Sequence, residues 1–356
     1  MTRRRSRLFR RFRGFSAVSA AALAATAAAV AEDATGSSGV AGAVALLQRE
    51  IQGELQHCRD AVVRVEAEDE HSRLAGSGFF VDPNGLLYTT YSVAGQSRDL
   101  VVIRGEQKYP ARLLIADRRS GIALLKVDIQ TPFLPVGKSR ELPIGAPVII
   151  CGFPTDHPLT PSFGLVGGFD RKYRARYFAT THIRASVPLQ PGEGGAPLLN
   201  MQGEVVGILI SPVGIGSSLA LPVEAAEKVR RDYERFGALR PGWLGLQMEE
   251  LTAPVHGSSA VVRDLYPGGP AERAGVKNGD VFLGLADFPI TCPQDMLDAS
   301  FFLTAQDPVA LKIMRGDTEQ TLQICPGDAP KAPSERPQLE PADERTETPL
   351  LRLDKK

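Results

Sequence analysis

The chain has 356 residues, of which 43% are hydrophobic, enough for two ordinary domains with buried cores. Lysine plus arginine and aspartate plus glutamate balance at 41 each, so no net charge favours nucleic acid or acidic lipid as a partner. The four cysteines show no C-x-x-C or Cys/His spacing typical of zinc sites. We therefore predict no metal, no cofactor and no nucleic-acid partner.

Residues 1–31 have the pattern of a secretory signal peptide. The basic segment "MTRRRSRLFRRFR" is followed by the uncharged "GFSAVSAAALAATAAAVA", which ends in an A-x-A cleavage pattern at Ala29-Val30-Ala31. We predict cleavage after Ala31 and an exported protein, periplasmic or extracellular. Arg10-Arg11 are compatible with a twin-arginine signal, and an uncleaved anchor or a transit peptide stays open as an alternative. No later segment has the length and apolar character of a membrane span.

Residues 32–60 are predicted to be a linker followed by a helix. The linker "EDATGSSGVAG" is small and polar, and "AVALLQREIQGELQHCRD" has apolar residues at helical spacing. Residues 61–237 contain many short strand patterns bounded by Gly, Pro, Asn or Asp, which predict a β-barrel or sandwich. This region closes with the helical segment "EAAEKVRRDYERFGA", for which Gly237 is the candidate C-cap.

Residues 238–326 form a second predicted module. It contains the turn "YPGGPAERAGVKNGD", a helix at "PQDMLDASFFLT" and strands at "VALKIMR" and "TLQICPG". Residues 327–356 are rich in proline and charge and are predicted to be disordered. Cys151 lies in a buried-strand pattern and is predicted to be an inert core residue. Whether Cys292 and Cys325 form a disulfide in this module stays open.

Five motifs between residues 60 and 326 occur in the order and spacing of one family. They are "AGSGFFVDPNGLLYTTYSVAG", "ADRRSGIALLKVD", "APVIICGFPTDHPLTPSFGLVGG", "QPGEGGAPLLNMQGEVVGI" and "SSLALPVE". Together they resemble the trypsin-like, PDZ-containing proteases of the high-temperature-requirement (HtrA) group. The resemblance implies a mostly β protein, a trypsin-like double β-barrel of two six-stranded barrels followed by one α+β PDZ domain.

Three positions depart from the catalytic pattern that this resemblance implies. The family's histidine base falls on Ser92, its orienting aspartate on Gly121 and its nucleophilic serine on Gly194. Acyl transfer by a serine protease needs all three side chains, so we predict a catalytically inactive homologue that is not an enzyme. The oxyanion hole is built from backbone amides, and those equivalent here belong to Gly192 and Gly194, although flexible glycines can also loosen the turn.

Other groups were considered as replacements for the missing base. Glu193 lies in the same turn as Gly194, and we predict an exposed turn residue or an ion-pair partner, with a carboxylate base as the alternative. His182 is expected to be a pocket or surface residue of the strand that resembles the S1 wall. His71 lies in the acidic segment "EAEDEHSR" and is predicted to be in a solvated loop.

The segment "RPGWLGLQMEEL" resembles the carboxylate-binding loop and adjoining strand of PDZ domains in this protease group. Backbone amides of Gly242, Trp243, Leu244 and Gly245 are predicted to form a nest for a terminal carboxylate. The strand that starts at Leu246 is predicted to pair with the peptide as an added strand. Met296 and Leu297 lie on the helix that would wall the groove, either as core residues or as ligand contacts.

These features predict that the protein binds peptides or protein C-termini as an adaptor, sensor or decoy in the cell envelope. Two alternatives stay open: an active serine-type endopeptidase for protein quality control with a non-standard active site, and a structural envelope scaffold. Homo-oligomers, or hetero-oligomers with an active relative, are a further possibility implied by the resemblance. The sequence of the ligand and the oligomeric state do not follow from the chain.

Overall fold

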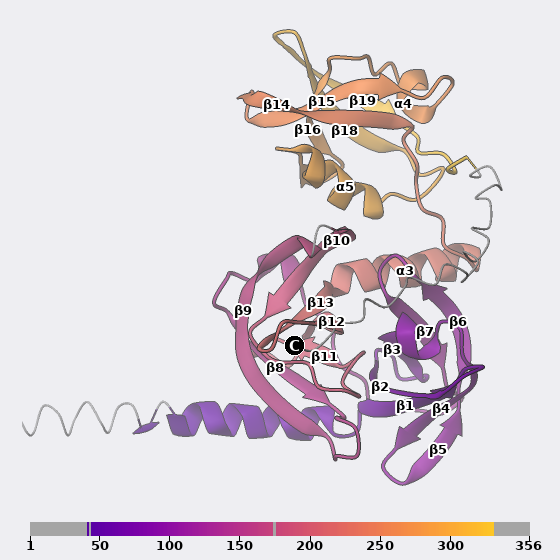
Figure 1. The fold of residues 1–356 in the computed structure, drawn as a ribbon, viewed down its shortest axis with the longest axis vertical. Coiled ribbons are helices and arrows are strands. Elements are labelled where there is room, and N and C mark those ends of the chain that lie inside the picture. The colour runs from indigo at the N-terminus through magenta and orange to yellow at the C-terminus, as the bar shows by residue number, and fades with distance from the viewer. Residues whose placement is uncertain (1–40, 43, 174–175, 331–356) are drawn as a thin grey trace, which may run out of the picture.

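The computed structural model describes residues 41–42, 44–173 and 176–330. The predicted signal peptide (1–31), most of the linker and nearly all of the predicted C-terminal tail lie outside the described residues. From residue 44 the chain forms an N-terminal helix (residues 44–58), a β domain, a closed β-barrel, a long helix and a smaller α+β domain (Figure 1).

The first β domain is an antiparallel seven-stranded sheet in the order β5-β4-β1-β2-β3-β7-β6. Its elements are β1 (Val62–Glu68), β2 (Arg73–Phe80), β3 (Leu86–Thr90), α2 (Tyr91–Ala94), β4 (Arg98–Arg104), β5 (Gln107–Pro110), β6 (Arg112–Asp117) and β7 (Ile122–Lys126). Alternating valines of β1 enclose one core together with Phe80, Leu87 and Leu125. The six-stranded barrel implied for this half differs, because a two-residue loop at Gly105–Glu106 adds the hairpin strand β5.

The second β domain is a closed six-stranded barrel in the order β10-β13-β12-β11-β8-β9. Its strands are β8 (Pro147–Gly152), β9 (Thr160–Tyr173), β10 (Arg176–Ala185), β11 (Pro197–Leu199), β12 (Val205–Val213) and β13 (Ser217–Pro222), and the short 3-10 helix η1 (Ser139–Glu141) precedes them. Closure leaves no free strand edge in the barrel. This half agrees with the implied six-stranded barrel.

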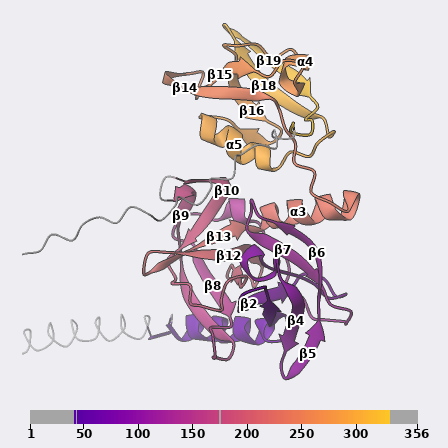
Figure 2. The same ribbon diagram turned by 45° about the vertical axis from the view of Figure 1, so that its right-hand side comes forward.

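Two helices cover the β domains. The helix α3 (Val223–Phe236) ends as expected at Gly237, which adopts a left-handed conformation with φ +68° and donates its amide to Tyr233 O. The N-terminal helix contributes Ile51, Leu55 and the fully buried Cys58 to the core cluster that also holds β8 and β11 residues. Figures 1 and 2 both place this helix at the end of the β domains away from the C-terminal domain.

The C-terminal domain is built on a six-stranded antiparallel sheet, in which five strands follow the order β14-β15-β16-β18-β19 and the sixth, β17, pairs with β16. Its elements are β14 (Leu246–Val255), β15 (Ser258–Leu265), α4 (Pro270–Arg273), β16 (Val281–Leu285), β17 (Phe288–Pro289), α5 (Pro293–Phe301), β18 (Val309–Arg315) and β19 (Thr318–Ile324). The strand β14 pairs only with β15 among the described strands, so its other edge is free for an added strand.

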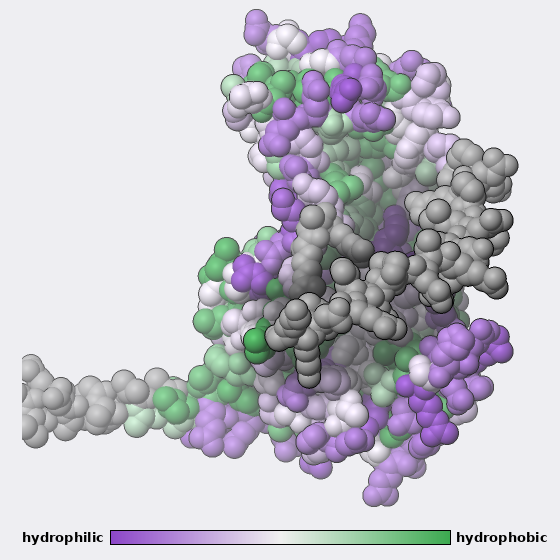
Figure 3. Space-filling view, viewed as in Figure 1, coloured by the Kyte–Doolittle hydropathy of each residue, from purple (hydrophilic) through white to green (hydrophobic). Residues whose placement is uncertain are grey.

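The two folded halves meet where α5 packs against β10. The space-filling view shows the molecule narrowing between the two halves (Figure 3). Asp298 of α5 accepts hydrogen bonds from the Thr180 hydroxyl and, at 2.5 Å, from the Thr181 amide. On α3, Asp232 accepts a hydrogen bond from the buried Lys228 ammonium at 2.6 Å. Across the junction it also accepts one from the Thr304 hydroxyl at 3.2 Å. None of the helices described here has the length and apolar character that crossing a bilayer requires.

Candidate active site and peptide groove

The structure brings the three triad-equivalent positions together between the two β domains. Ser92 lies on α2, and its hydroxyl donates to Thr90 Oγ1 at 3.0 Å. The Tyr91 amide donates to Gly121 O at 2.7 Å, which joins the second position to the first. A Cβ built on Gly194 would lie 3.7 Å from Thr90 Cγ2 and 3.8 Å from Thr90 Oγ1. The folded chain therefore keeps the place of the site while Ser92, Gly121 and Gly194 occupy it.

The turn that carries Gly194 is held by backbone contacts from the first β domain. Ser77 donates its amide to Gly194 O at 2.8 Å and its hydroxyl to Gly192 O at 2.9 Å. Gly195 has φ +91°, and a Cβ there would lie 2.2 Å from Ser77 O. Only glycine fits such a backbone contact, so the packing requires glycine at position 195. Ser77 is a site residue that the sequence analysis missed, although it stands in the quoted "GSGFF" motif.

The amides of Gly192 and Gly194 donate no hydrogen bond within the described part of the chain, whereas their carbonyls are both occupied by Ser77. Gly192 has φ +92°, and the Thr155 amide, which donates to Pro191 O at 2.8 Å, supports the turn from behind. Two free amides beside the Gly194 position are the donor type that stabilises a developing oxyanion. They are the two amides that the sequence predicts as an oxyanion hole.

The backbone would accept the missing serine side chain but not the missing aspartate side chain. Gly194 does not have a positive φ, and no described atom lies closer than 3.7 Å to an added Cβ, so a serine side chain would fit there. Gly121 has φ +79°, where an aspartate would be strained, and its added Cβ would lie 3.1 Å from Ile210 Cγ2. The backbone at Gly121 thus has a conformation suited to glycine.

Glu193 is buried, with 1% of its surface exposed, so the prediction of an exposed turn residue or an ion-pair partner is wrong. Its Oε2 accepts the Gln190 amide at 2.8 Å, while Oε1 is buried without a hydrogen-bond partner among the described residues. Burial raises the pKa of this carboxyl, and the Gln190 amide partly opposes that shift. The side chain closes its own turn, since it accepts the Gln190 amide while the Glu193 amide donates to Gln190 O at 3.1 Å.

His182 is also buried, not a surface residue, with 5% exposure. Its Nδ1 lies 2.8 Å from Thr180 O, and its ring packs 4.4 Å from the Phe178 ring centroid. Burial lowers the pKa of this imidazole. His71 is exposed and belongs to the turn closed by Asp69, as predicted for a solvated loop.

In the C-terminal domain, the loop before β14 differs from the predicted carboxylate nest in two of its four amides. Gly242 donates to Leu303 O at 3.0 Å and Trp243 donates to Gly327 O at 2.8 Å, so these amides are already engaged. Leu244 and Gly245 donate no hydrogen bond within the described residues, and Leu246 begins the free edge of β14. Of the four amides predicted to form the nest, those of Leu244 and Gly245 are therefore free within the described residues.

The helix α5 has one buried face and one exposed face. Met296, predicted as a peptide contact with a core position as the alternative, is buried (6% exposed) in the core of the C-terminal domain, so the core alternative is the correct one. Leu297 is 45% exposed and is the large apolar side chain of α5 that remains accessible to a ligand. The Trp243 ring packs edge-on against Tyr266 at 5.0 Å and covers Gly245, which has φ +74°.

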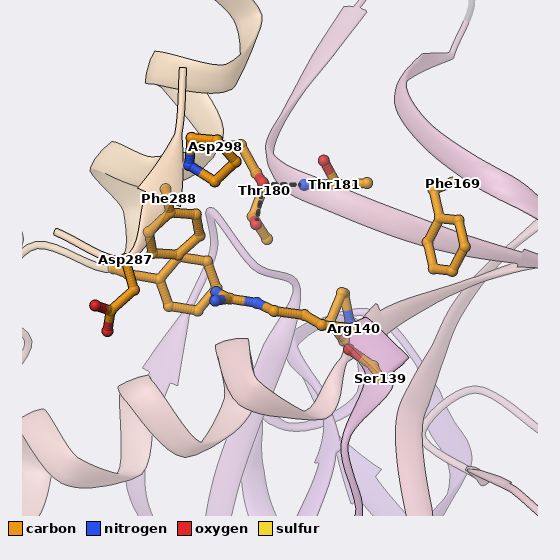
Figure 4. Close-up of a pocket in the computed structure, with 11 residues that line it drawn as sticks. Ser139, Arg140, Phe169, Thr180, Thr181, Asp287, Phe288 and Asp298 are labelled. Carbon is orange, nitrogen blue, oxygen red and sulfur yellow. Dashed lines mark hydrogen bonds between the residues drawn. The ribbon is translucent and has the colours of Figure 1, made fainter. Parts of the chain in front are cut away.

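A cavity of about 330 Å³ lies at the junction of the two halves (Figure 4). Arg140 of η1 extends toward β17, with its guanidinium carbon 4.1 Å from the Phe288 ring centroid and 4.7 Å from that of Phe302. Asp298 and Thr180 form part of its wall. None of the lining residues belongs to the triad-equivalent positions or to the 242–246 loop.

Comparison with protein families assigns both halves. Residues 76–208 match the trypsin-like peptidase domain, and residues 242–325 match the PDZ domain. The fold and the position of the site thus define a trypsin-like peptidase domain followed by a PDZ domain.

Curated relatives show which trypsin-like peptidases this chain is similar to. The chain is 30% identical over 270 residues to a "Probable periplasmic serine endoprotease DegP-like" of Pseudomonas fluorescens, and 30% identical over 281 residues to a protein of the same name from Halomonas elongata. The alignments cover 72% and 74% of this chain but only 56% and 59% of the relatives' length. The chain is thus similar to DegP-like serine endoproteases over a little more than half of their length, and the periplasmic relatives confirm the prediction of export.

Solved structures share the fold. "HtrA-type protease AlgW with tripeptide" aligns with a TM-score of 0.66 at 21% identity, covering 79% of this chain and 98% of that chain. The serine endoprotease from Yersinia pestis aligns with a TM-score of 0.59 at 23% identity over 79% of this chain and 98% of its own.

These comparisons contradict the prediction that the chain is not an enzyme. The matching family is a peptidase domain, and the relatives are named serine endoproteases. The prediction equated three absent side chains with absent catalysis, but oxyanion stabilisation and substrate binding come from backbone and pocket, and contribute rate without the triad.

Proposed function

We propose that the protein is an HtrA-like endopeptidase of the cell envelope with a non-standard active site, which selects substrates by binding their C-terminal ends in the PDZ domain. The observation that carries the proposal is the supported turn at Gly192–Gly195 with two free amides. The endoprotease names of the relatives provide independent support.

The proposed chemistry relies on the backbone. Water attacks the scissile carbonyl, and the Gly192 and Gly194 amides stabilise the oxyanion that forms. Collapse of this intermediate breaks the C–N bond and releases a carboxylic acid and an amine, with the water's protons passing to these products. Because Ser92 and Gly121 offer neither an imidazole nor a carboxylate, attack through a histidine-activated serine is not available at these positions. Removal of all triad members from a serine protease of another fold leaves about 10³–10⁴-fold acceleration over water. We expect a rate of this low order.

The proposed substrate recognition uses the free edge of β14 and the amides of Leu244 and Gly245. A peptide strand added to β14 would place its terminal carboxylate at the loop, and Leu297 would contact an apolar side chain near that end. Peptides are bound by the HtrA-type protease AlgW, whose fold this chain shares. The free carboxylate is therefore the chemical group that we expect the domain to require.

Two measurements test the two halves of the proposal. Turnover of unfolded, fluorescently labelled casein is measured for the purified protein beside a mock preparation and beside Ser77→Ala, which removes a support of the turn. Turnover that co-purifies with the protein and falls in Ser77→Ala supports the endopeptidase. Activity equal to the mock overturns it.

Peptide binding is measured separately by fluorescence anisotropy with free-carboxylate and amidated forms of the same peptides. Preference for the free carboxylate, lost in Leu297→Asp, supports C-terminal recognition. Equal binding of the two forms would refute it.

A further inference from the structure

We propose that Cys58 and Cys151 form a disulfide in the exported protein. Cys58 is the last residue of the N-terminal helix and Cys151 lies in β8, so the whole first β domain separates them in sequence. Both side chains are fully buried in the same apolar cluster, where the two thiols are close enough that Cys151 raises the pKa of Cys58. Thiols that neighbour each other in one packed cluster need only a local adjustment to reach disulfide geometry.

The cellular compartment favours this bond. The relatives are periplasmic, and disulfides form and persist in that oxidising environment. The pair left open by the sequence is a weaker candidate, because Cys325 is exposed and Cys292 accepts a hydrogen bond from Arg171 at 3.3 Å. Of the four cysteines, only Cys58 and Cys151 are buried together.

The reaction is thiol–disulfide exchange with a protein disulfide oxidant. One thiolate attacks the oxidant's disulfide to form a mixed disulfide and releases one oxidant thiol; the second thiolate then displaces the other. Two protein thiols become one disulfide, and the oxidant's disulfide becomes two thiols. Interaction with the Cys151 thiol and burial raise the pKa of Cys58, so the folded pair is poorly reactive. The thiol–disulfide exchange therefore takes place before folding buries Cys58 and Cys151.

The bond would fasten the N-terminal helix to the candidate active site. Cys151 adjoins Gly152, where an added Cβ would lie 3.1 Å from Glu193 Cγ. The next residue, Phe153, donates its amide to Ser77 Oγ at 2.9 Å. Strand β8 thus supports the Gly192–Gly195 turn directly, and a cross-link at Cys151 restrains that support.

The test compares the full chain produced by export with a chain lacking residues 1–31 produced in a reducing cytoplasm. Each is alkylated in denaturant without reductant, digested and mapped by mass spectrometry. The exported protein should give a cross-linked peptide joining Cys58 to Cys151 that is lighter by two hydrogen atoms and is split by reductant. Quantitative alkylation of both cysteines in the exported protein would overturn the proposal, and so would a map joining different cysteines.

Stability provides a second readout. Reductant should lower the unfolding midpoint of the exported protein by several degrees, but leave the exported double variant Cys58→Ala/Cys151→Ala unchanged. The matched control Cys292→Ala/Cys325→Ala should respond to reductant like the parent. A parent midpoint insensitive to reductant under conditions that cleave the mapped bond would contradict a structural role. The mapping uses the unsubstituted chain, so it stands even where a variant folds poorly.

Discussion

Replacing Glu193 by glutamine should stabilise the protein at neutral pH. The carboxyl is buried, Oε1 has no partner among the described residues, and burial raises the pKa of the group. A buried polar atom without a hydrogen bond costs about 1–3 kcal/mol, and ionisation adds to that cost. Glutamine keeps an acceptor for the Gln190 amide but carries no charge. We expect a gain of about 1 kcal/mol at pH 7, or roughly 2–4 °C in the unfolding midpoint.

The pH dependence of this gain has a definite sign. Because the folded-state pKa is raised, the native state holds its proton to higher pH than the unfolded chain, so stability falls as pH rises through that interval. The advantage of Glu193→Gln should therefore be present at pH 7 and vanish below the unfolded pKa of about 4.3.

Denaturant unfolding at pH 4 and pH 7 measures this difference, and Glu204→Gln, at a partly exposed site in the same barrel, serves as the control. A glutamine variant less stable than the parent at pH 7 would show that the carboxylate has a cationic partner, and would refute the reasoning.

Three further substitutions test the site and its supports. Gly194→Ser should leave stability within about 0.5 kcal/mol of the parent and casein turnover unchanged, because the side chain fits but no base is present; a large rise in turnover would reveal a base elsewhere. Gly195→Ala should lower stability by at least about 2 kcal/mol in denaturant unfolding, since φ is +91° and Ser77 O blocks the methyl group; a neutral effect would contradict the described turn. Asp232→Ala should cost about 3–5 kcal/mol by leaving the buried Lys228 ammonium uncompensated, and a loss below about 1 kcal/mol would argue against that pair.

The sequence predicted the fold because local patterns and tertiary packing agree over most of the chain. The apolar alternation of β1 and the helical spacing before Gly237 both appear in the structure. The fifth strand of the first β domain was not anticipated, because "QKYP" is short and mostly exposed and so carries no apolar alternation.

The candidate site was predicted in position but not in detail. Motif order located Ser92, Gly121 and Gly194, which the folded chain brings together. Burial of Glu193 could not be inferred, because its charge favours exposure and it is covered by its own turn and by β8, which meet only in the folded chain. The engaged amides of Gly242 and Trp243 were equally hidden, since their partners lie more than 60 residues later in the chain.

The backbone of the site is more strictly determined than its side chains. Gly192 and Gly195 have positive φ values and close contacts with Phe153 and Ser77 that exclude any side chain, whereas a Cβ on Gly194 would make only ordinary van der Waals contacts with Thr90. Gly121 combines a left-handed conformation with a near contact to Ile210. An aspartate at this position would therefore require the backbone that leads into β7 to move. Replacing Gly194 by serine therefore adds a side chain without moving the backbone. Replacing Gly121 by aspartate requires a local change of the backbone. Catalysis by this chain is consequently expected to depend on how firmly Ser77 and β8 hold the two free amides.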